Sequence, residues 1–222
     1  MRSRQSGWRF AIKVIMDRAA AGIGLILLSP MVFLVSITIL LFMGRPAFFF
    51  QWRPGRWARP FRVVKFRTMT DARGPDGELL PSAQRINPLG RFLRATSLDE
   101  IPQLWNVLRG DLSLVGPRPL RMRYLERYTP EQARRHEVLP GITGWAQING
   151  RNAISWEDKF ELDVWYVDQW SLRLDLRILL TTVLKVLRRE GIAPRGQATV
   201  SEFLGSANTS GRDGGGNAAR VD

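Results

Sequence analysis

An uncharged run of 25 residues, from Ala19 to Met43, dominates the first part of the chain. A continuous helix of that length can cross a hydrocarbon core of about 30 Å. Pro30 lies near the centre of the run. Because a proline inside a helix removes one backbone donor and clashes with the preceding turn, the run predicts two helical segments, 19–28 and 31–43, with a break between them.

Basic residues flank this run on both sides, which bears on its topology. They are Arg2, Arg4, Arg9, Lys13 and Arg18 before it, and Arg45, Arg53, Arg56, Arg59 and Arg62 after it. A single span is enriched in basic residues on its cytoplasmic side, so two basic flanks predict that both ends are cytoplasmic. Each half is roughly 15 to 20 Å long, short of a full crossing, and the Ser29 hydroxyl can donate to the carbonyl of Leu25 at the break. We therefore expect a re-entrant helix-break-helix; a kinked ordinary span is the alternative.

The composition restricts the chemistry that the chain can perform. It has no cysteine and one histidine, His136, so a disulfide framework, a zinc enzyme and a Ser-His-Asp hydrolase are all disfavoured. Acid, base or nucleophilic chemistry then depends on carboxylates. The net charge of +13 indicates anionic partners such as phosphates, acidic headgroups or nucleic acid.

We divide the chain into a basic N-terminus with the membrane element over 1–46, a compact domain over 47–204 and a Gly/Ser/Asn-rich tail over 205–222, which we expect to be disordered. The expected fold class is α+β and mostly helical. Residues 48–69 predict a small β-hairpin around an Arg-Pro-Gly-Arg turn. Lys65 and Arg67 then share one face of its second strand, as phosphate-binding residues or simply as a solvated face.

Residues 97–110, "SLDEIPQLWNVLRG", predict a helix that begins near Asp99 and stops at Gly110. Either Ser97 or Asp99 can be its N-cap residue. Both readings put two adjacent carboxylates, Asp99 and Glu100, at the positive end of a helix. Since adjacent side chains diverge by about 100°, one can act as a nucleophile while the other holds a metal; alternatively both only stabilise the helix terminus.

Two further segments carry candidate ligand-binding residues. In "GPRP" two prolines fix the loop that presents Arg118, whose guanidinium suits bidentate phosphate binding. Residues 140–152 predict a glycine-rich loop with Gln147 and Arg151 on a polar edge, or else a plain connector.

The last two predicted elements are helices. Residues 154–170 predict a helix with Asp163 at the edge of its apolar stripe, where it faces a site or a partner. Residues 171–191 predict a second helix with an apolar face, which is either a core helix or a helix lying on an anionic membrane surface.

These blocks together resemble one family. "SLDEIPQLWNVLRGDLSLVGPRP", "KFRTM" upstream, "PGITGWAQINGRN" downstream and the apolar segment with Ser29 and Pro30 are similar to the bacterial sugar transferases, the monotopic polyprenyl-phosphate phosphoglycosyl transferases. The resemblance covers nearly all of the chain except the tail and matches the short form. The ending "GQATVSEF" resembles that of the small di-N-acetylbacillosamine phosphotransferases.

The resemblance implies an activity and a set of site residues. The family transfers a sugar 1-phosphate from a UDP-sugar to undecaprenyl phosphate with magnesium, releases UMP, and works at the cytoplasmic face of the bacterial inner membrane. It implies that Asp99 is the nucleophile and that the Asp99–Glu100 pair holds the metal. The active-site polar positions implied by the match are Lys65, Arg94, Arg118, Asp163 and Asp175.

Two rival functions differ from this one in testable ways. Direct displacement on the same fold would use Asp99 as a base. A membrane-tethered module that binds nucleic acid or anionic lipid would explain the positive net charge, but it would not explain why the motif blocks occur in this order. We therefore expect no nucleic-acid partner. The residues predict neither the sugar, the pathway nor the oligomeric state.

Overall fold

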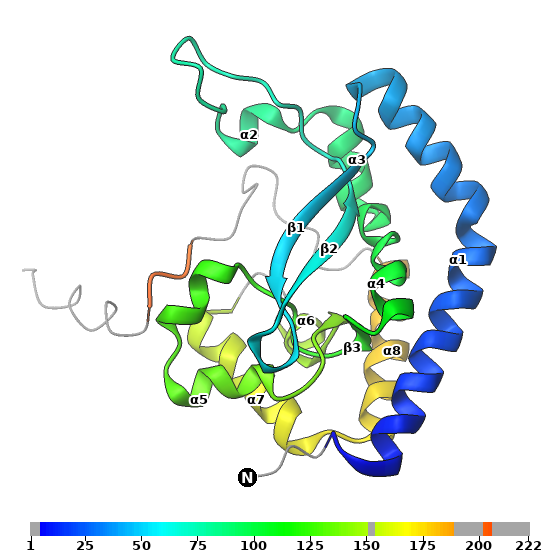
Figure 1. The fold of residues 1–222 in the computed structure, drawn as a ribbon, viewed down its shortest axis with the longest axis vertical. Coiled ribbons are helices and arrows are strands. Elements are labelled where there is room, and N and C mark those ends of the chain that lie inside the picture. The colour runs from blue at the N-terminus through cyan, green and yellow to red at the C-terminus, as the bar shows by residue number, and fades with distance from the viewer. Residues whose placement is uncertain (1–4, 151–153, 189–201, 206–222) are drawn as a thin grey trace, which may run out of the picture.

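The computed structural model describes residues 5–150, 154–188 and 202–205. Its fold is mostly helical with two small sheets, as expected for the α+β class (Figure 1). The α-helices are α1 Gly7–Met43, α2 Ser82–Arg85, α3 Pro88–Ala95, α4 Gln103–Arg109, α5 Pro130–Ala133, α6 Trp145–Asn149, α7 Trp156–Gln169 and α8 Leu172–Leu187. The strands are β1 Phe48–Pro54, β2 Pro60–Phe66, β3 Ser113–Val115 and β4 Gly141–Thr143, and the 3-10 turns are η1 Arg56–Ala58, η2 Leu98–Glu100, η3 Met122–Arg127 and η4 Arg134–His136.

The apolar run forms one continuous helix, so the predicted break into two helices is wrong. α1 has Pro30 in its interior and bows along one side of the molecule (Figure 1). The Ser29 hydroxyl donates to the carbonyl of Ile26, 2.8 Å away, rather than to that of Leu25. This bond lies in the turn where the proline withholds a donor, and it keeps polar backbone partnered while the helix continues.

The length and surface of α1 indicate membrane association. Its 37 residues make a helix about 55 Å long, and it is the one helix of the described chain that is long and apolar enough to cross a membrane. The most hydrophobic part of the helix is almost entirely uncovered by the rest of the molecule. An uncovered apolar surface of this extent requires an apolar environment.

The predicted hairpin is confirmed, but its predicted turn is wrong: β1 continues through Arg53 and Pro54, and the loop is formed by 55–59. β1 and β2 pair antiparallel, with Phe49 opposite Lys65 and Arg53 opposite Phe61. Directly opposite residues project to the same side of a sheet, so Arg53 and Lys65 lie on the face that carries the buried Phe61 and Val63.

The segment predicted as a glycine-rich loop instead contains β4 and α6. β4 pairs parallel with β3, and Gly141 lies opposite Ser113. A side chain at Gly141 would overlap the backbone nitrogen of Gly116, so only glycine permits this approach. The pairing fixes the chain on either side of the loop that carries Arg118.

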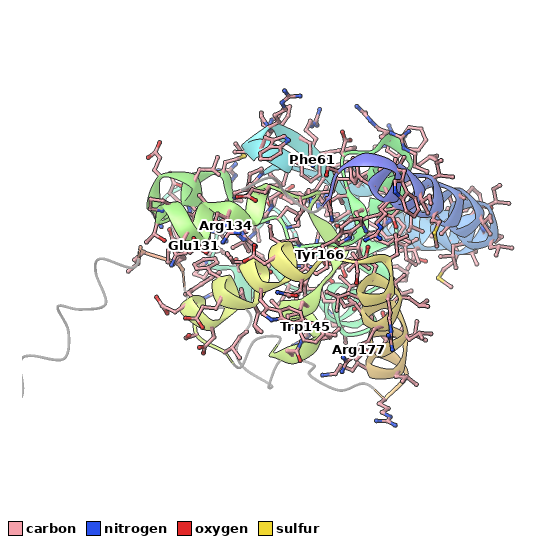
Figure 2. All side chains as sticks on the ribbon, turned by 90° about the horizontal axis from the view of Figure 1, so that it is seen from below. Phe61, Glu131, Arg134, Trp145, Tyr166 and Arg177 are labelled. Atoms are coloured by element: carbon pink, nitrogen blue, oxygen red, sulfur yellow. The ribbon has the colours of Figure 1, made fainter. Side chains whose placement is uncertain are left out.

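Four hydrophobic clusters hold these elements together. The largest lies between β3, α6, α7 and α8, and its buried members are Val115, Val138, Ile148, Tyr166, Val167, Trp170 and Ile178. Ala21 of α1 packs with Phe61 and Val107, which joins α1 to the hairpin and to α4. Figure 2 shows Tyr166 in the interior, and Arg177 of α8 close to the ring of Trp145, 5.7 Å from its centroid. The domain is therefore packed around β3 and the hairpin, with α1 on its outside.

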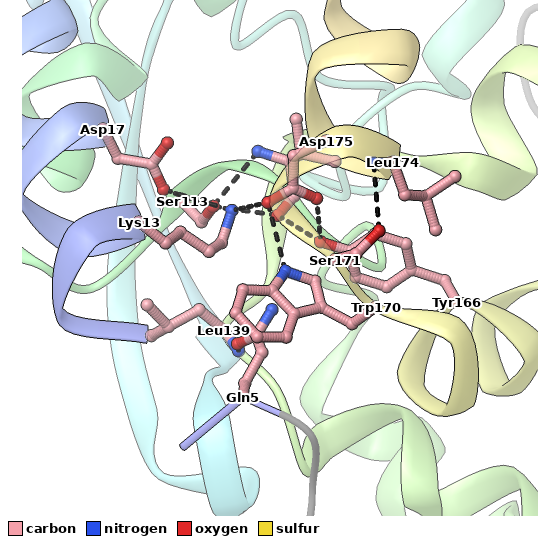
Figure 3. A network of polar contacts seen from close by, with 11 residues as sticks. Gln5, Lys13, Asp17, Ser113, Leu139, Tyr166, Trp170, Ser171, Leu174 and Asp175 are labelled. Atoms are coloured by element: carbon pink, nitrogen blue, oxygen red, sulfur yellow. Dashed lines mark hydrogen bonds and ion pairs between the residues drawn. The ribbon is translucent and has the colours of Figure 1, made fainter. Parts of the chain in front are cut away.

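A buried polar network joins α1 to the domain (Figure 3). Lys13 donates to Asp175 of α8 at 2.7 Å and lies 3.3 Å from Asp17, which accepts from Ser113 at 2.6 Å. The hydroxyl of Tyr166 donates to Asp175 as well, at 2.7 Å. Lys13, Asp17 and Ala21 recur every four residues, so they form the face of α1 that turns toward the domain.

The predicted helices near the C-terminus are confirmed, with shorter bounds. α8 buries Asp175 and Ile178. Its other face is apolar and exposed, with Leu176, Leu180, Val183, Leu184 and Val186 each at least 45% accessible. The core-helix alternative is therefore wrong for this face. Except for Gly205, the tail over 205–222 lies outside the described residues.

Candidate active site

The turn that carries Asp99 and Glu100 is tighter than an α-helix. Leu98–Glu100 forms η2, and α4 follows only from Gln103. Neither Ser97 nor Asp99 caps a helix with its side chain, so both predicted capping arrangements are wrong. Ser97 adopts a left-handed conformation with φ of 58°, which reverses the chain between α3 and the two carboxylates.

Glu100 is held by two cations from different elements. Lys65 of β2 donates to Oε1 at 2.6 Å, and Arg118 donates to both carboxylate oxygens, to Oε2 at 3.2 Å and to Oε1. Burial alone would raise the pKa of Glu100, but the charges and hydrogen bonds of Arg118 and Lys65 outweigh it and hold the pKa well below the usual range. Glu100 therefore stays ionised and fixes two cations at the site.

Asp99 is in the opposite situation. Its side chain is buried, and within the described chain it makes no hydrogen bond or ion pair. Burial and the adjacent charge of Glu100 raise the pKa of Asp99, against the opposing charges of Lys65, Arg118 and Arg94. A buried carboxylate with free oxygens and cations nearby is suited to attack an electrophile or to bind a metal.

Arg94 approaches this turn from α3. Its Nε donates to the hydroxyl of Thr68 at 2.9 Å, just beyond the end of β2. α3 lies close to this part of the chain because Gly90 meets the carbonyl of Thr68, where a side chain would overlap it. The positive charge of Arg94 acts to lower the pKa of Asp99, although the two side chains form no ion pair.

Asp163 supports the Arg118 loop from behind. It forms a buried ion pair with Arg135, in which Nη2 lies 2.6 Å from Oδ2. Arg135 also donates to the backbone carbonyl of Arg118 at 2.8 Å and to the hydroxyl of Tyr128 at 3.1 Å. Asp163 thus acts on the site through Arg135 and the Arg118 backbone.

Two predicted site residues lie elsewhere. Asp175 belongs to the buried network that anchors α1, as described above. Arg67 donates to the carbonyls of Met69 and Arg45 at 3.0 and 2.8 Å and pairs with Asp71, so it braces the junction between α1 and the hairpin. The structure brings together Lys65, Asp99, Glu100 and Arg118, with Arg94 at their edge.

Gln147 and Arg151 complete the predicted set. Both polar atoms of the Gln147 amide are buried, and neither has a hydrogen-bond partner in the described chain. Arg151 lies outside the described residues. A ligand-binding role for Gln147 stays a prediction.

Sequence reasoning missed Arg135 and treated Arg53 only as part of a basic flank. Arg135 precedes the lone histidine in a stretch with no motif, and its partner Asp163 is 28 residues away. No local signal could have linked them. Arg53 could have been found from its register, because it shares a hairpin face with Lys65.

The donor set fits a magnesium ion that is shared with a substrate. The described residues contain no group of three His, Cys, Asp or Glu side chains able to form a cage. Magnesium is commonly held by one or two carboxylates together with substrate phosphates. Asp99 has the free oxygens for this, whereas both oxygens of Glu100 already contact cations.

Comparison with known proteins identifies relatives over most of the chain. The model of the bacterial sugar transferase family matches residues 8–189. The uncharacterized sugar transferase EpsL of Bacillus subtilis is 58% identical over 200 residues, which cover 90% of this chain and 98% of that protein. A UDP-glucose:undecaprenyl-phosphate glucose-1-phosphate transferase of Caulobacter vibrioides is 40% identical over 79% of this chain and 69% of its own. An undecaprenyl-phosphate galactose phosphotransferase of Salmonella typhimurium is 38% identical over 75% of this chain, which spans only 40% of that relative.

Proposed function

The chain belongs to the bacterial sugar transferase family, and from this premise we propose that it transfers a sugar 1-phosphate from a UDP-sugar to undecaprenyl phosphate and releases UMP. The observation that carries the proposal is the pairing of a free, buried Asp99 with a Glu100 whose charge is fixed by Lys65 and Arg118. This arrangement gives two adjacent carboxylates different tasks.

The proposed reaction has two displacements. A carboxylate oxygen of Asp99 attacks the phosphorus that bears the sugar, the bond from that phosphorus to the UMP oxygen breaks, and UMP leaves with the electron pair. An oxygen of the lipid phosphate then attacks the same phosphorus and frees the Asp99 carboxylate. Each step exchanges one phosphorus–oxygen bond for another, and the two anionic substrates never have to occupy the site together.

The surrounding residues reduce the cost of bringing anions together. Lys65, Arg94 and Arg118 place positive charge around the carboxylate that attacks, which stabilises the charge that accumulates on the phosphoryl oxygens. Magnesium held by the free oxygens of Asp99 together with the diphosphate would neutralise further charge, and Glu100 would join it only by giving up a contact to Lys65 or Arg118.

The membrane supplies the lipid substrate, and we propose that α1 enters and leaves its cytoplasmic leaflet. Basic flanks on both sides of the apolar run support this re-entrant arrangement over a full crossing, and Pro30 inside α1 marks the point where the helix can bend. The exposed apolar face of α8 and the exposed Trp105 of α4 are suited to contact the same leaflet. The site would then open where the lipid phosphate is found.

The covalent step can be tested without the lipid. Purified enzyme with magnesium and a panel of UDP-sugars should release up to one equivalent of UMP with the correct sugar. The peptide containing Asp99 should gain the mass of a sugar phosphate. Asp99→Asn should lose both signals, whereas the exposed control Glu161→Gln should keep them.

Two results would contradict parts of the proposal. Turnover with lipid but no UMP release and no adduct without it would leave direct displacement, with Asp99 as a base. No UMP from any UDP-sugar, with or without the lipid, would remove the nucleotide donor altogether.

A further inference from the structure

We propose that Arg53 is an additional substrate-binding residue, whose guanidinium contacts the phosphate of the nucleotide that leaves. The inference deepens the proposed function and rests on it. Nothing in the motif pattern assigns Arg53 a role; its position in the hairpin does.

The register of the hairpin turns Arg53 toward the site. Arg53 lies opposite Phe61, and Lys65 lies opposite Phe49, so both cations project from the same face. Phe61 on that face is buried against α4, which follows the Asp99–Glu100 turn. Arg53 lies at the turn end of this face, where the charge of Arg118 reaches it, and Lys65 lies at the other end, where it contacts Glu100.

Arg53 differs from three other arginines of the domain that are at least partly buried. Arg118 pairs with Glu100, Arg135 with Asp163 and Arg67 with Asp71. Within the described chain, Arg53 pairs with no carboxylate; its one hydrogen bond goes to the neutral Gln51 side chain, at 2.6 Å. That bond orients the guanidinium and leaves other N–H groups to donate.

The surroundings of Arg53 are also unfavourable for a cation. Burial and the neighbouring charges of Arg118 and Arg121 lower the pKa of Arg53 to about 10. A half-buried cation that faces two others, with no acid to offset them, becomes stable when an anion binds between them. A planar guanidinium with free N–H groups suits a phosphate with two available oxygens.

The nucleotide phosphate is the anion that this position fits. A sugar nucleotide presents two phosphoryl groups at once, and Asp99 attacks one of them. Lys65 and Arg118 are already joined to Glu100 beside Asp99, so the second phosphoryl group needs a further cation. The lipid carries a phosphate too, and the experiment must separate these two sources.

UMP binding gives the direct test, because it needs no knowledge of the sugar. Calorimetry on the purified full chain should show UMP binding weakened at least about tenfold in Arg53→Gln, the effect expected for lost hydrogen bonds to a charged group. Arg62→Gln is the matched control, because Arg62 lies on the same hairpin, is exposed and stacks on Phe50. It should bind UMP like the unmodified protein. Arg53→Lys keeps the positive charge but loses the planar pair of N–H donors, so its affinity for UMP should lie between those of Arg53→Gln and Arg62→Gln.

Kinetics then distinguish the two phosphates. Arg53→Gln should raise the KM for the UDP-sugar and leave the KM for undecaprenyl phosphate unchanged. Unchanged UMP binding in Arg53→Gln and Arg53→Lys, both with wild-type melting temperatures, would overturn the inference, as would a rise confined to the KM for the lipid. Absence of UMP binding in the unmodified protein would instead count against the proposed nucleotide donor.

Discussion

Asp99 and Glu100 are neighbours in sequence, yet their surroundings shift their pKa values in opposite directions. Glu100 receives Lys65 and Arg118 directly, and its pKa lies below the usual range. Asp99 is buried beside the negative charge of Glu100 and accepts no hydrogen bond within the described chain. Its pKa is therefore raised. One residue is a permanent anion that organises cations, and the other is a more basic carboxylate that is free to react.

This difference predicts the acidic limit of activity. Because Asp99 must be ionised to react, activity should fall as the pH drops through its raised pKa. Arg94→Gln removes a cation that lowers this pKa, so the acidic limb of the kcat/KM profile should move to higher pH. We also expect kcat/KM at neutral pH to fall roughly tenfold if Arg94 contacts a phosphate.

Arg91→Gln is the control for this experiment, since Arg91 lies on the same helix and is exposed. The acidic limb of the kcat/KM profile of Arg91→Gln should lie at the same pH as that of the unmodified protein. A limb that moves equally in both variants would show that net charge, rather than the position of Arg94, sets the pKa of Asp99.

At the scale of elements, α1 depends on a few buried polar contacts. Lys13 is 2% exposed and joins Asp175 and Asp17. Lys13→Met should leave both carboxylates without their cation, and removal of one partner from a buried pair typically costs about 3 to 5 kcal/mol. Urea unfolding in detergent, followed by tryptophan fluorescence, should show this loss.

A double-mutant cycle gives the matching control. Adding Asp175→Asn to Lys13→Met should restore part of the stability, because the amide no longer carries an unpaired charge. Arg173→Gln, an exposed change in the same helix as Asp175, should change stability by less than about 0.5 kcal/mol. Additive effects of the two network substitutions would contradict a direct Lys13–Asp175 interaction.

The sequence predicted those elements whose signals are local. The hairpin was indicated by two apolar stretches on either side of a Pro-Gly pair, although its loop lies slightly later than predicted. The helices α7 and α8 were indicated by their periodicity, and the Arg118 loop by its two flanking prolines. It did not predict β3 and β4, because strands of three residues carry no alternation and their pairing depends on the approach of Gly141 to Gly116. Asp175 was misplaced for a related reason, since its partner Lys13 is 162 residues away.

At the scale of the whole molecule, the membrane arrangement is open to a labelling test. The chain has no cysteine, so Ser6→Cys and Ala72→Cys each introduce one exposed thiol, before and after the apolar run. With both flanks cytoplasmic, an impermeant thiol reagent should label neither in intact cells and both in permeabilised cells.

Labelling of just one thiol in intact cells would make α1 an ordinary span. A Pro30→Leu, Ser29→Ala variant provides the complementary observation. Restoring the missing donor should straighten α1, and we expect one flank to cross the membrane with loss of transfer activity.

The network around Lys13 also sets an order of events while the protein is being made. Chains are synthesised from the N-terminus, so α1 leaves the ribosome long before its partners exist. Ser113 follows Asp17 by 96 residues, and Asp175 follows Lys13 by 162. Until β3 has been translated Asp17 lacks Ser113, and until α8 has been translated Lys13 lacks Asp175. α1 is therefore available to the membrane before its partners in the domain exist, and we expect the domain to be assembled onto a helix that is already in place.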